Sequence, residues 1–198
     1  WIHCHSQWHL EHRMSTLEVK ELSHPSGEVI KIAAGKTLDL KSQGSVTMPT
    51  GSVIQVVSAE EPYSPSSTTS GTFVALGGGA SITPSTTASR VVVTISCDVR
   101  GGDSNSFGFG IMRSINGGAY SMVQTYVRHA TYPVLSDETV SMTYTDSPNT
   151  TSVVSYKVGL VVYGSNAVQL LPNPYTKTGN PNGSGGSAGL WTLMEIQG

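Results

Sequence analysis

The sequence predicts an all-β protein: an antiparallel β-sandwich of jelly-roll type that follows a short β-structured stem. After Met14, apolar residues almost never recur at helical spacing. Short runs rich in Val, Ile, Thr and aromatic residues recur instead, bounded by Gly, Pro, Asn or Ser. Alternation in runs such as SMTYT and VSYKVGLVVY gives each strand one apolar face, so a second sheet must cover that face.

Residues 1–14 form a leader whose composition differs from that of the remaining chain. The leader carries residue types that bind zinc, copper or nickel, namely His3, Cys4, His5, His9 and His12. Three interpretations compete: translated upstream or vector sequence, an N-terminal anchor, and a metal site. We expect an anchor, because Trp1 and Trp8 offer aromatic surface for docking, and we expect no metal, because no partner ligands lie nearby in the sequence.

The next segment, residues 15–48, consists of short pieces that each end at Gly or Pro: EVIKIAAG, KTLDLKSQG and SVTMP. None of these pieces is long enough to build a hydrophobic core alone. Strand edges with no partner in their own chain are prone to pair with another chain. We therefore expect this segment to be a self-associating stem.

Residues 49–198 predict the sandwich, which forms a C-terminal knob. The expected strands cover residues 52–57, 72–77, 90–99, 107–115, 120–126, 139–146, 152–164 and 190–197. Asn116-Gly117-Gly118 predicts a tight hairpin, because an Asn-Gly pair adopts the positive φ angles that such a turn requires. Residues 64–71 and 178–189, rich in Ser, Thr and Gly, predict surface loops. The expected core includes Phe73, Cys97, Phe107, Phe109, Trp191 and Leu193.

Composition excludes several classes of partner. Charged residues make up 12% of the chain, the net charge is -2 and the 11 Lys and Arg residues are scattered, which argues against nucleic acid. The longest apolar runs are far shorter than the roughly 20 residues that cross a bilayer, so no membrane insertion is expected. Two cysteines give no disulfide framework and suit assembly in a reducing cytoplasm. The run GSGGSAG lacks the Lys-Ser/Thr ending of a phosphate-binding loop, and we expect no cofactor.

Four segments, taken in order, carry a resemblance to a known family: MPTGSVIQVVS (48–58), SITPSTTASRVVVTISCDV (81–99), VSMTYTDSPNTTSVVSYKVGLVV (140–162) and WTLMEIQG (191–198). With the start MSTLEVKEL (14–22), they resemble tail-fibre and related appendage proteins of marine and cyanobacterial tailed phages. The resemblance covers residues 14–198. It implies a homotrimeric, non-enzymatic virion protein, assembled in the host cytoplasm, whose knob contacts a host-surface protein or glycan. The leader would then contact other virion proteins.

Two other functions stay open at this stage. At 198 residues the chain is short for a whole tail fibre, which keeps a structural decoration or adaptor of the virion as an alternative. A glycan depolymerase would need two placed carboxylates, and adjacent pairs such as Glu60-Glu61 point to opposite faces of a strand. Outside the leader, His24 and His129 are the only histidines, and neither adjoins a G-x-S-x-G nucleophile motif. We therefore expect no enzymatic activity.

The candidate receptor-binding residues lie where a strand gives way to a loop that contains proline. The segment QTYVRHATYP brings together Tyr126, Arg128, His129 and Tyr132, and Tyr175 in LPNPYTKTG is a second candidate. Tyr and Arg are frequent anchors in protein and glycan recognition. The alternative is that Tyr126 and Tyr132 pack beneath the loop.

Overall fold

The computed structural model describes residues 34–36, 46, 48–60, 66–101, 106–130, 136–164, 166–171 and 189–198. The chain divides into two units, Trp1–Val46 and Thr47–Gly198. Most of the predicted leader and stem therefore lies outside the described residues, and the fold described below is that of the second unit. In the part of the chain that is described, no helix has the length and apolar character needed to cross a membrane.

The described residues of the second unit form ten strands, which confirms the all-β prediction. They are β1 (Val53–Glu60), β2 (Ser66–Thr68), β3 (Val74–Ile82), β4 (Arg90–Gly101), β5 (Ser106–Ile115), β6 (Ser121–Ala130), β7 (Ser136–Asp146), β8 (Val154–Val162), β9 (Val168–Leu171) and β10 (Leu190–Ile196). Eight correspond to predicted strands. The short strands β2 and β9 were not predicted, and β2 lies within residues 64–71, which the sequence analysis treats as a loop.

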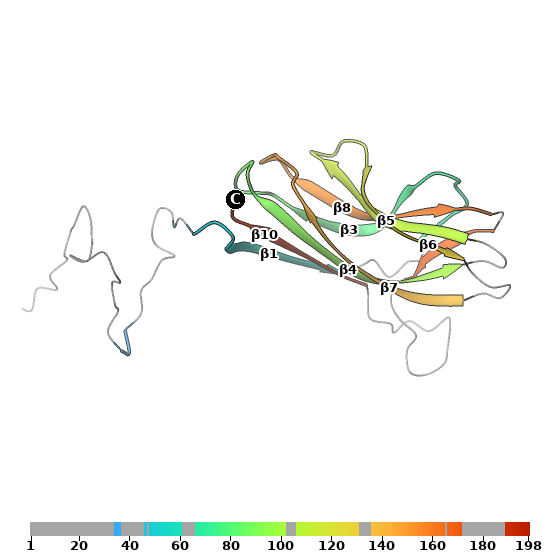
Figure 1. Ribbon diagram of the computed structural model, residues 1–198, viewed down its shortest axis with the longest axis horizontal. Helices are drawn as coiled ribbons and strands as arrows, with labels where there is room; N and C mark the ends of the chain where they lie inside the picture. The colour runs from blue at the N-terminus through green and yellow to red at the C-terminus, as the bar shows by residue number, and fades with distance from the viewer. Residues whose placement is uncertain are drawn as a thin grey trace, which may run out of the picture. The chain divides into compact units, whose positions relative to one another are not determined.

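The strands form two antiparallel sheets that pack as two layers (Figure 1). In the six-stranded sheet, β4 pairs with β7 along its whole length on one edge. The other edge of β4 pairs with β10 over the first part of β4 and with β9 over the last part. β1 pairs with the far edge of β10, and β2 pairs with the far edge of β9. The four-stranded sheet has the order β3-β8-β5-β6.

The pairing pattern identifies the sandwich as a jelly roll. Leaving aside the short β2 and β9, the first of eight strands pairs with the last, the second with the seventh, the third with the sixth and the fourth with the fifth: β1 with β10, β3 with β8, β4 with β7, and β5 with β6. This is an antiparallel hairpin rolled up on itself. The predicted jelly-roll-like sandwich is confirmed in this unit.

The core lies between the two sheets and follows the alternation of the strands. On β4 and β8, every second residue points inward and is buried: Val91, Val93, Ile95, Cys97 and Val99, and Val154, Tyr156, Val158, Leu160 and Val162. Phe107, Phe109, Trp191 and Leu193 are also buried, which confirms their predicted place in the core. A sheet with one apolar face is stable only when that face is covered, and each sheet covers the other.

The hairpin between β5 and β6 confirms the strongest local sequence prediction. Asn116 has a φ angle of 51° and Gly117 one of 72°, so both adopt the left-handed conformation that a tight turn between twisted strands requires. Gly118 N donates a hydrogen bond of 3.0 Å to Ile115 O and closes the turn.

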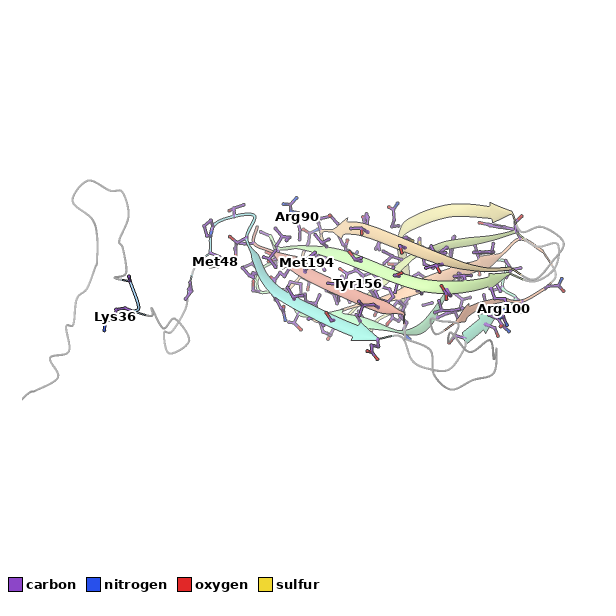
Figure 2. The ribbon with its side chains drawn as sticks, turned by 90° about the horizontal axis from the view of Figure 1, so that it is seen from below. Lys36, Met48, Arg90, Arg100, Tyr156 and Met194 are labelled. Atoms are coloured by element: carbon purple, nitrogen blue, oxygen red, sulfur yellow. The ribbon has the colours of Figure 1, made fainter. Side chains whose placement is uncertain are left out.

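One end of the sandwich, here called the entry end, is where the chain enters the fold. Gly51 N donates to Gln197 O, and Gln197 N donates to Ser52 O, both at 2.8 Å. The segment before β1 is therefore fixed beside the end of β10. Arg90, which begins β4, pairs with Ile196 at this end. Figure 2 shows Met48 and Arg90 at this end and Arg100 near the other.

The opposite end, here called the loop end, collects most of the longer connections. The described residues that flank residues 61–65, 102–105, 131–135, 165 and 172–188 lie at or within two residues of strand ends at this end of the sandwich. Ser106 pairs with Ala130 here, and Gly101 pairs with Ser136. The chain therefore enters the jelly roll at one end and carries its long connections at the other.

A buried polar link joins the two sheets. Asp146, at the end of β7, accepts hydrogen bonds from Arg113 Nη1 on β5 at 2.8 Å (Oδ1) and 2.9 Å (Oδ2), and from the Tyr156 hydroxyl on β8 at 2.8 Å (Oδ2). Tyr156 lies inside the sandwich (Figure 2). Burial raises the pKa of the Tyr156 hydroxyl, and the hydrogen bond to Asp146 raises it further. The hydroxyl therefore stays protonated as the donor.

Replacing Tyr156 by Phe should lower the free energy of unfolding, because a buried carboxylate then loses one of its donors. We expect a loss of about 1–3 kcal/mol, measured by chemical denaturation, and a fall in Tm of several degrees. In an Asp146→Ala background the same substitution should cost much less, since the acceptor is gone. Equal costs in both backgrounds would show that the hydroxyl acts through packing and not through this hydrogen bond.

Candidate functional site

Three of the predicted receptor-binding residues lie on β6 close to the loop end, and the structure describes their backbone positions. Tyr126, Arg128 and His129 pair with β5, where their partners are Phe109, Gly108 and Phe107 respectively. β6 is an edge strand of the four-stranded sheet. The other two candidates, Tyr132 and Tyr175, lie outside the described residues. The binding role of all five residues stays a prediction.

An exposed aromatic residue lies in the same part of the four-stranded sheet. Tyr163 directly follows β8, and its backbone N donates a hydrogen bond of 2.8 Å to Ser106 O at the start of β5. Its side chain is 51% exposed, and among the side chains that the structure describes it is the only aromatic one in the exposed class. Tyr163 therefore stands at the loop end, two strands away from Ala130 across the sheet.

Tyr163 and Phe73 together cover a glycine on the outer face of the sheet. Phe107 and Phe109 point into the core, so Gly108 between them faces outward. A Cβ atom at Gly108 would lie 2.7 Å from Val161 Cγ1, 3.1 Å from Phe73 Cζ and 3.4 Å from Tyr163 Cε2. The absence of a side chain at Gly108 thus lets both rings lie close to the sheet. Phe73 was predicted to be in the core, and this is wrong: it is half-buried on the outside of the sandwich.

Hydroxyl groups lie beside this aromatic pair. Val162 N donates a hydrogen bond of 2.9 Å to Ser70 O, which fixes the connection between β2 and β3 next to β8. The hydroxyls of Ser70 and Thr72 lie 3.1 Å apart, and Thr72 is exposed. Aromatic surface with neighbouring hydroxyls is the composition of adaptable recognition surfaces. We call Tyr163, Phe73, Ser70 and Thr72 the loop-end platform.

Tyr163 was not predicted as a surface residue, because it lies at the end of the apolar run VGLVVYG and resembles part of a core strand. The signal that distinguishes it is the alternation itself. Lys157 lies on the same strand, and its Nζ is 5.5 Å from the centre of the Tyr120 ring on the outside of the sheet. Residues an even number of positions from Lys157 share its face, which places Tyr163 outside and Tyr156 inside.

Three of the described carboxylates are buried, those of Asp98, Asp146 and Glu195. Glu195 on β10 is 1% exposed, and its Oε1 accepts hydrogen bonds from Ser85 N at 2.6 Å and Ser85 Oγ at 2.7 Å. With its amide turned to satisfy both groups, Gln55 donates to Glu195 Oε2 at 3.2 Å. Asp146, 3% exposed, is held by Arg113 and Tyr156 as described above. Asp98 Oδ1 accepts a hydrogen bond of 2.6 Å from Thr139 Oγ1, so each of the three buried carboxylates is bound by donors of its own chain.

The pKa of Glu195 reflects this environment. Burial by itself would raise the pKa, but hydrogen bonds from Ser89 and Ser85 outweigh burial and hold the pKa below its ordinary value. The carboxylate is therefore charged at neutral pH and fixes the connection between β3 and β4 onto the last strand. This arrangement suits a structural group, because a general acid needs a raised pKa and access to a substrate.

Within the described ranges, no group of three or more His, Cys, Asp or Glu side chains lies close enough to hold a metal ion. The leader histidines lie outside those ranges, so their interpretation stays open.

Comparisons with known proteins give no family assignment. No protein-family model and no curated protein matches the chain. Among solved structures, the chain is similar to one in the structure of infectious bursal disease virus Gt strain, with 11% identity and a TM-score of 0.41, covering 82% of this chain and 42% of that one. A chain of the Gx strain gives 10% identity and a TM-score of 0.38, covering 81% and 42%. This chain thus spans less than half of those chains.

Glu195→Gln should destabilise the protein at neutral pH, because the Gln amide nitrogen cannot accept the hydrogen bonds that the carboxylate accepts. We expect a loss of about 1–3 kcal/mol in the free energy of unfolding near pH 7. The folded pKa of Glu195 lies below the ordinary value of 4.5, so the stabilisation is complete above that pH and is lost as the pH falls through the lower folded pKa.

The difference between the variant and the wild type should therefore shrink on acidification, which urea denaturation at a series of pH values measures. Glu60→Gln, at an exposed carboxylate on β1, is the matched control and should change stability by less than about 0.5 kcal/mol. A Glu195→Gln difference that stays constant down to about pH 3 would contradict the assignment.

Proposed function

We propose that this chain is a non-enzymatic virion protein that binds the host cell through its jelly-roll knob, as a trimeric fibre or appendage of a tailed phage. The family resemblance of residues 14–198 supports the virion role and the trimer. The jelly roll is compatible with it, because this architecture serves capsid and lectin domains among others. Fold alone does not assign function, so the argument rests on the arrangement of the site.

The observation that carries the proposal is the division of the sandwich into two ends. The N-terminal residues attach at the entry end, where Gly51 and Ser52 bond to Gln197. The long connections and the exposed Tyr163 lie at the opposite end. A knob held on a stem presents the end away from its attachment, and that is where the loop-end platform and the β6 candidates are found.

Support for binding without catalysis comes from the carboxylates. Glu195 and Asp146 are saturated by donors from their own chain and are buried, so they serve the fold. Recognition by a knob needs no reactive group: a few aromatic and Arg anchors with polar surroundings are sufficient. In a trimer each site is repeated three times, and avidity raises the strength of a weak single contact by about two to four orders of magnitude.

The leader and stem complete the proposal. Residues 1–14 attach the fibre to other virion proteins, residues 15–48 join three chains, and the knob contacts a host-surface protein or glycan. A decoration or adaptor of the virion is the second candidate, since jelly rolls also build capsid domains. The two roles differ in whether the isolated protein adsorbs to cells.

Tyr163→Ala should reduce adsorption of the fluorescently labelled full chain to intact cells by about tenfold or more, because loss of an interface Tyr commonly costs at least about 1.4 kcal/mol. The measurement uses flow cytometry with a panel of marine cyanobacteria and other marine bacteria. Tyr120→Ala is the matched control, because Tyr120 lies on the same outer face before β6, towards the entry end. It should adsorb as the wild type does.

The sequence-predicted residues are tested in the same assay with the double variant Arg128→Ala/Tyr132→Ala, which should abolish adsorption without lowering Tm. If this variant melts several degrees earlier, the two residues are packing residues. If the wild-type chain adsorbs to no strain of the panel while antibodies locate it on the capsid, the receptor-binding role is overturned in favour of a decoration protein.

A further inference from the structure

An apolar patch lies on the outer face of the six-stranded sheet at the entry end. Val53 and Val56 on β1 are 49% and 58% exposed. Val53 pairs with Ile196, and Val56 pairs with Met194, which in turn pairs with Val92 on β4. Their chain neighbours Val91, Val93, Leu193 and Glu195 are buried, so Val92, Met194 and Ile196 face outward. We call these five residues (Val53, Val56, Val92, Met194 and Ile196) the entry patch.

The entry patch differs from the surface that continues from it toward the loop end. The next row across the sheet consists of hydroxyl residues, namely Ser58, Thr192, Thr94 and Thr143. Thr94 Oγ1 and Thr143 Oγ1 lie 3.2 Å apart, and the Ser141 hydroxyl donates to Ser96 Oγ at 3.0 Å. This part of the face is polar and readily hydrated. The apolar residues on three adjacent strands are therefore confined to the end of the sheet where the chain enters.

The position of the patch indicates what covers it. The segment leading into β1 includes Met48, which is also exposed, and Figure 2 shows Met48 and Met194 at the same end of the sandwich. Forty-six residues precede this unit and are attached beside the patch. If those residues join three chains, as the proposed function holds, the knobs leave the stem at this end. The surfaces nearest the attachment point are then the ones that meet.

We propose that the entry patch is the contact through which the knobs of neighbouring copies pack against each other. The inference rests on the proposed trimer and adds the surface that stabilises it. The five patch residues are all apolar, and the one charged residue that pairs with them, Arg90 opposite Ile196, is exposed at the border of the patch. Neighbouring copies can therefore pack on the patch while the Arg90 guanidinium stays in water at the rim. Single exposed valines are ordinary on a protein surface, but a contiguous set across three strands marks an interaction site.

The first experiment introduces a charge into the patch of the full chain. Val56→Glu should raise the dissociation constant of the trimer by about tenfold or more, measured by sedimentation velocity over a range of concentrations. Val56 is mostly exposed, so the substitution leaves the fold intact, which circular dichroism checks. Val153→Glu is the matched control. Val153 is 38% exposed and directly precedes β8 in the four-stranded sheet, so this substitution should leave association unchanged.

The second experiment distinguishes a neighbouring copy from the chain's own N-terminal residues. In a Cys4→Ser background, where Cys97 is fully buried, Val56→Cys should form a disulfide-linked dimer on oxidation, seen on a non-reducing gel. Val153→Cys should not. Absence of the linked dimer, with association unaffected by Val56→Glu, overturns the inference and indicates that residues 1–46 or water cover the patch.

The same measurements separate failure of the inference from failure of the proposed function. A wild-type chain that is monomeric at every concentration overturns the trimer itself, and with it the inference. A wild-type trimer that Val56→Glu does not weaken overturns only the role of the entry patch. The proposed trimeric fibre, associated through its stem, is then unaffected.

Discussion

The buried carboxylate of Asp146 is the constraint on which the two-sheet arrangement depends. It ends an edge strand of one sheet and is bound by Arg113 and Tyr156 from the other. Apolar side chains between two sheets tolerate sliding, because dispersion and burial have little directional preference. Hydrogen bonds to a charged group in a buried site do have direction, and leaving one unmade is costly. The link therefore fixes the position of one sheet relative to the other. A core of Val and Leu side chains alone would not define that position.

A fixed sandwich gives the two ends separate roles. Glu195 and its serine donors hold the connection between β3 and β4 at the entry end, close to where Gln197 binds the incoming segment. The loop-end platform lies at the other end of the strands, away from these contacts. Under the proposed function, the stabilising contacts and the recognition surface lie at opposite ends of one set of strands, so the recognition surface can change in sequence while the scaffold stays constant.

Local features of the fold, such as turns, could be predicted from the sequence, whereas pairings between strands far apart in the chain could not. The β5–β6 hairpin could be predicted because Asn116 and Gly117 carry the turn geometry in their own backbone preferences. The pairing of β10 with β1 and β4 could not, since no local pattern encodes partners so far apart in the chain. Alternation shows which residues share a face, but not which connection folds over that face. For that reason Phe73 was assigned to the core, and Tyr163 was missed although its parity with Lys157 was visible.

The central place of β10 has a consequence for how the protein folds. β10 lies between β1 and β4, so until the chain beyond residue 189 has left the ribosome β1 has no paired strand in the sheet and β4 lacks the neighbour opposite β7 along its first half. During synthesis β1 presents Val53 and Val56 on an open strand for most of the time that the knob is being made. Pairings between distant segments form slowly, and such open edges are where chains associate wrongly. The six-stranded sheet can therefore be completed only after β10 has been synthesised, and the knob cannot reach its final packing before that.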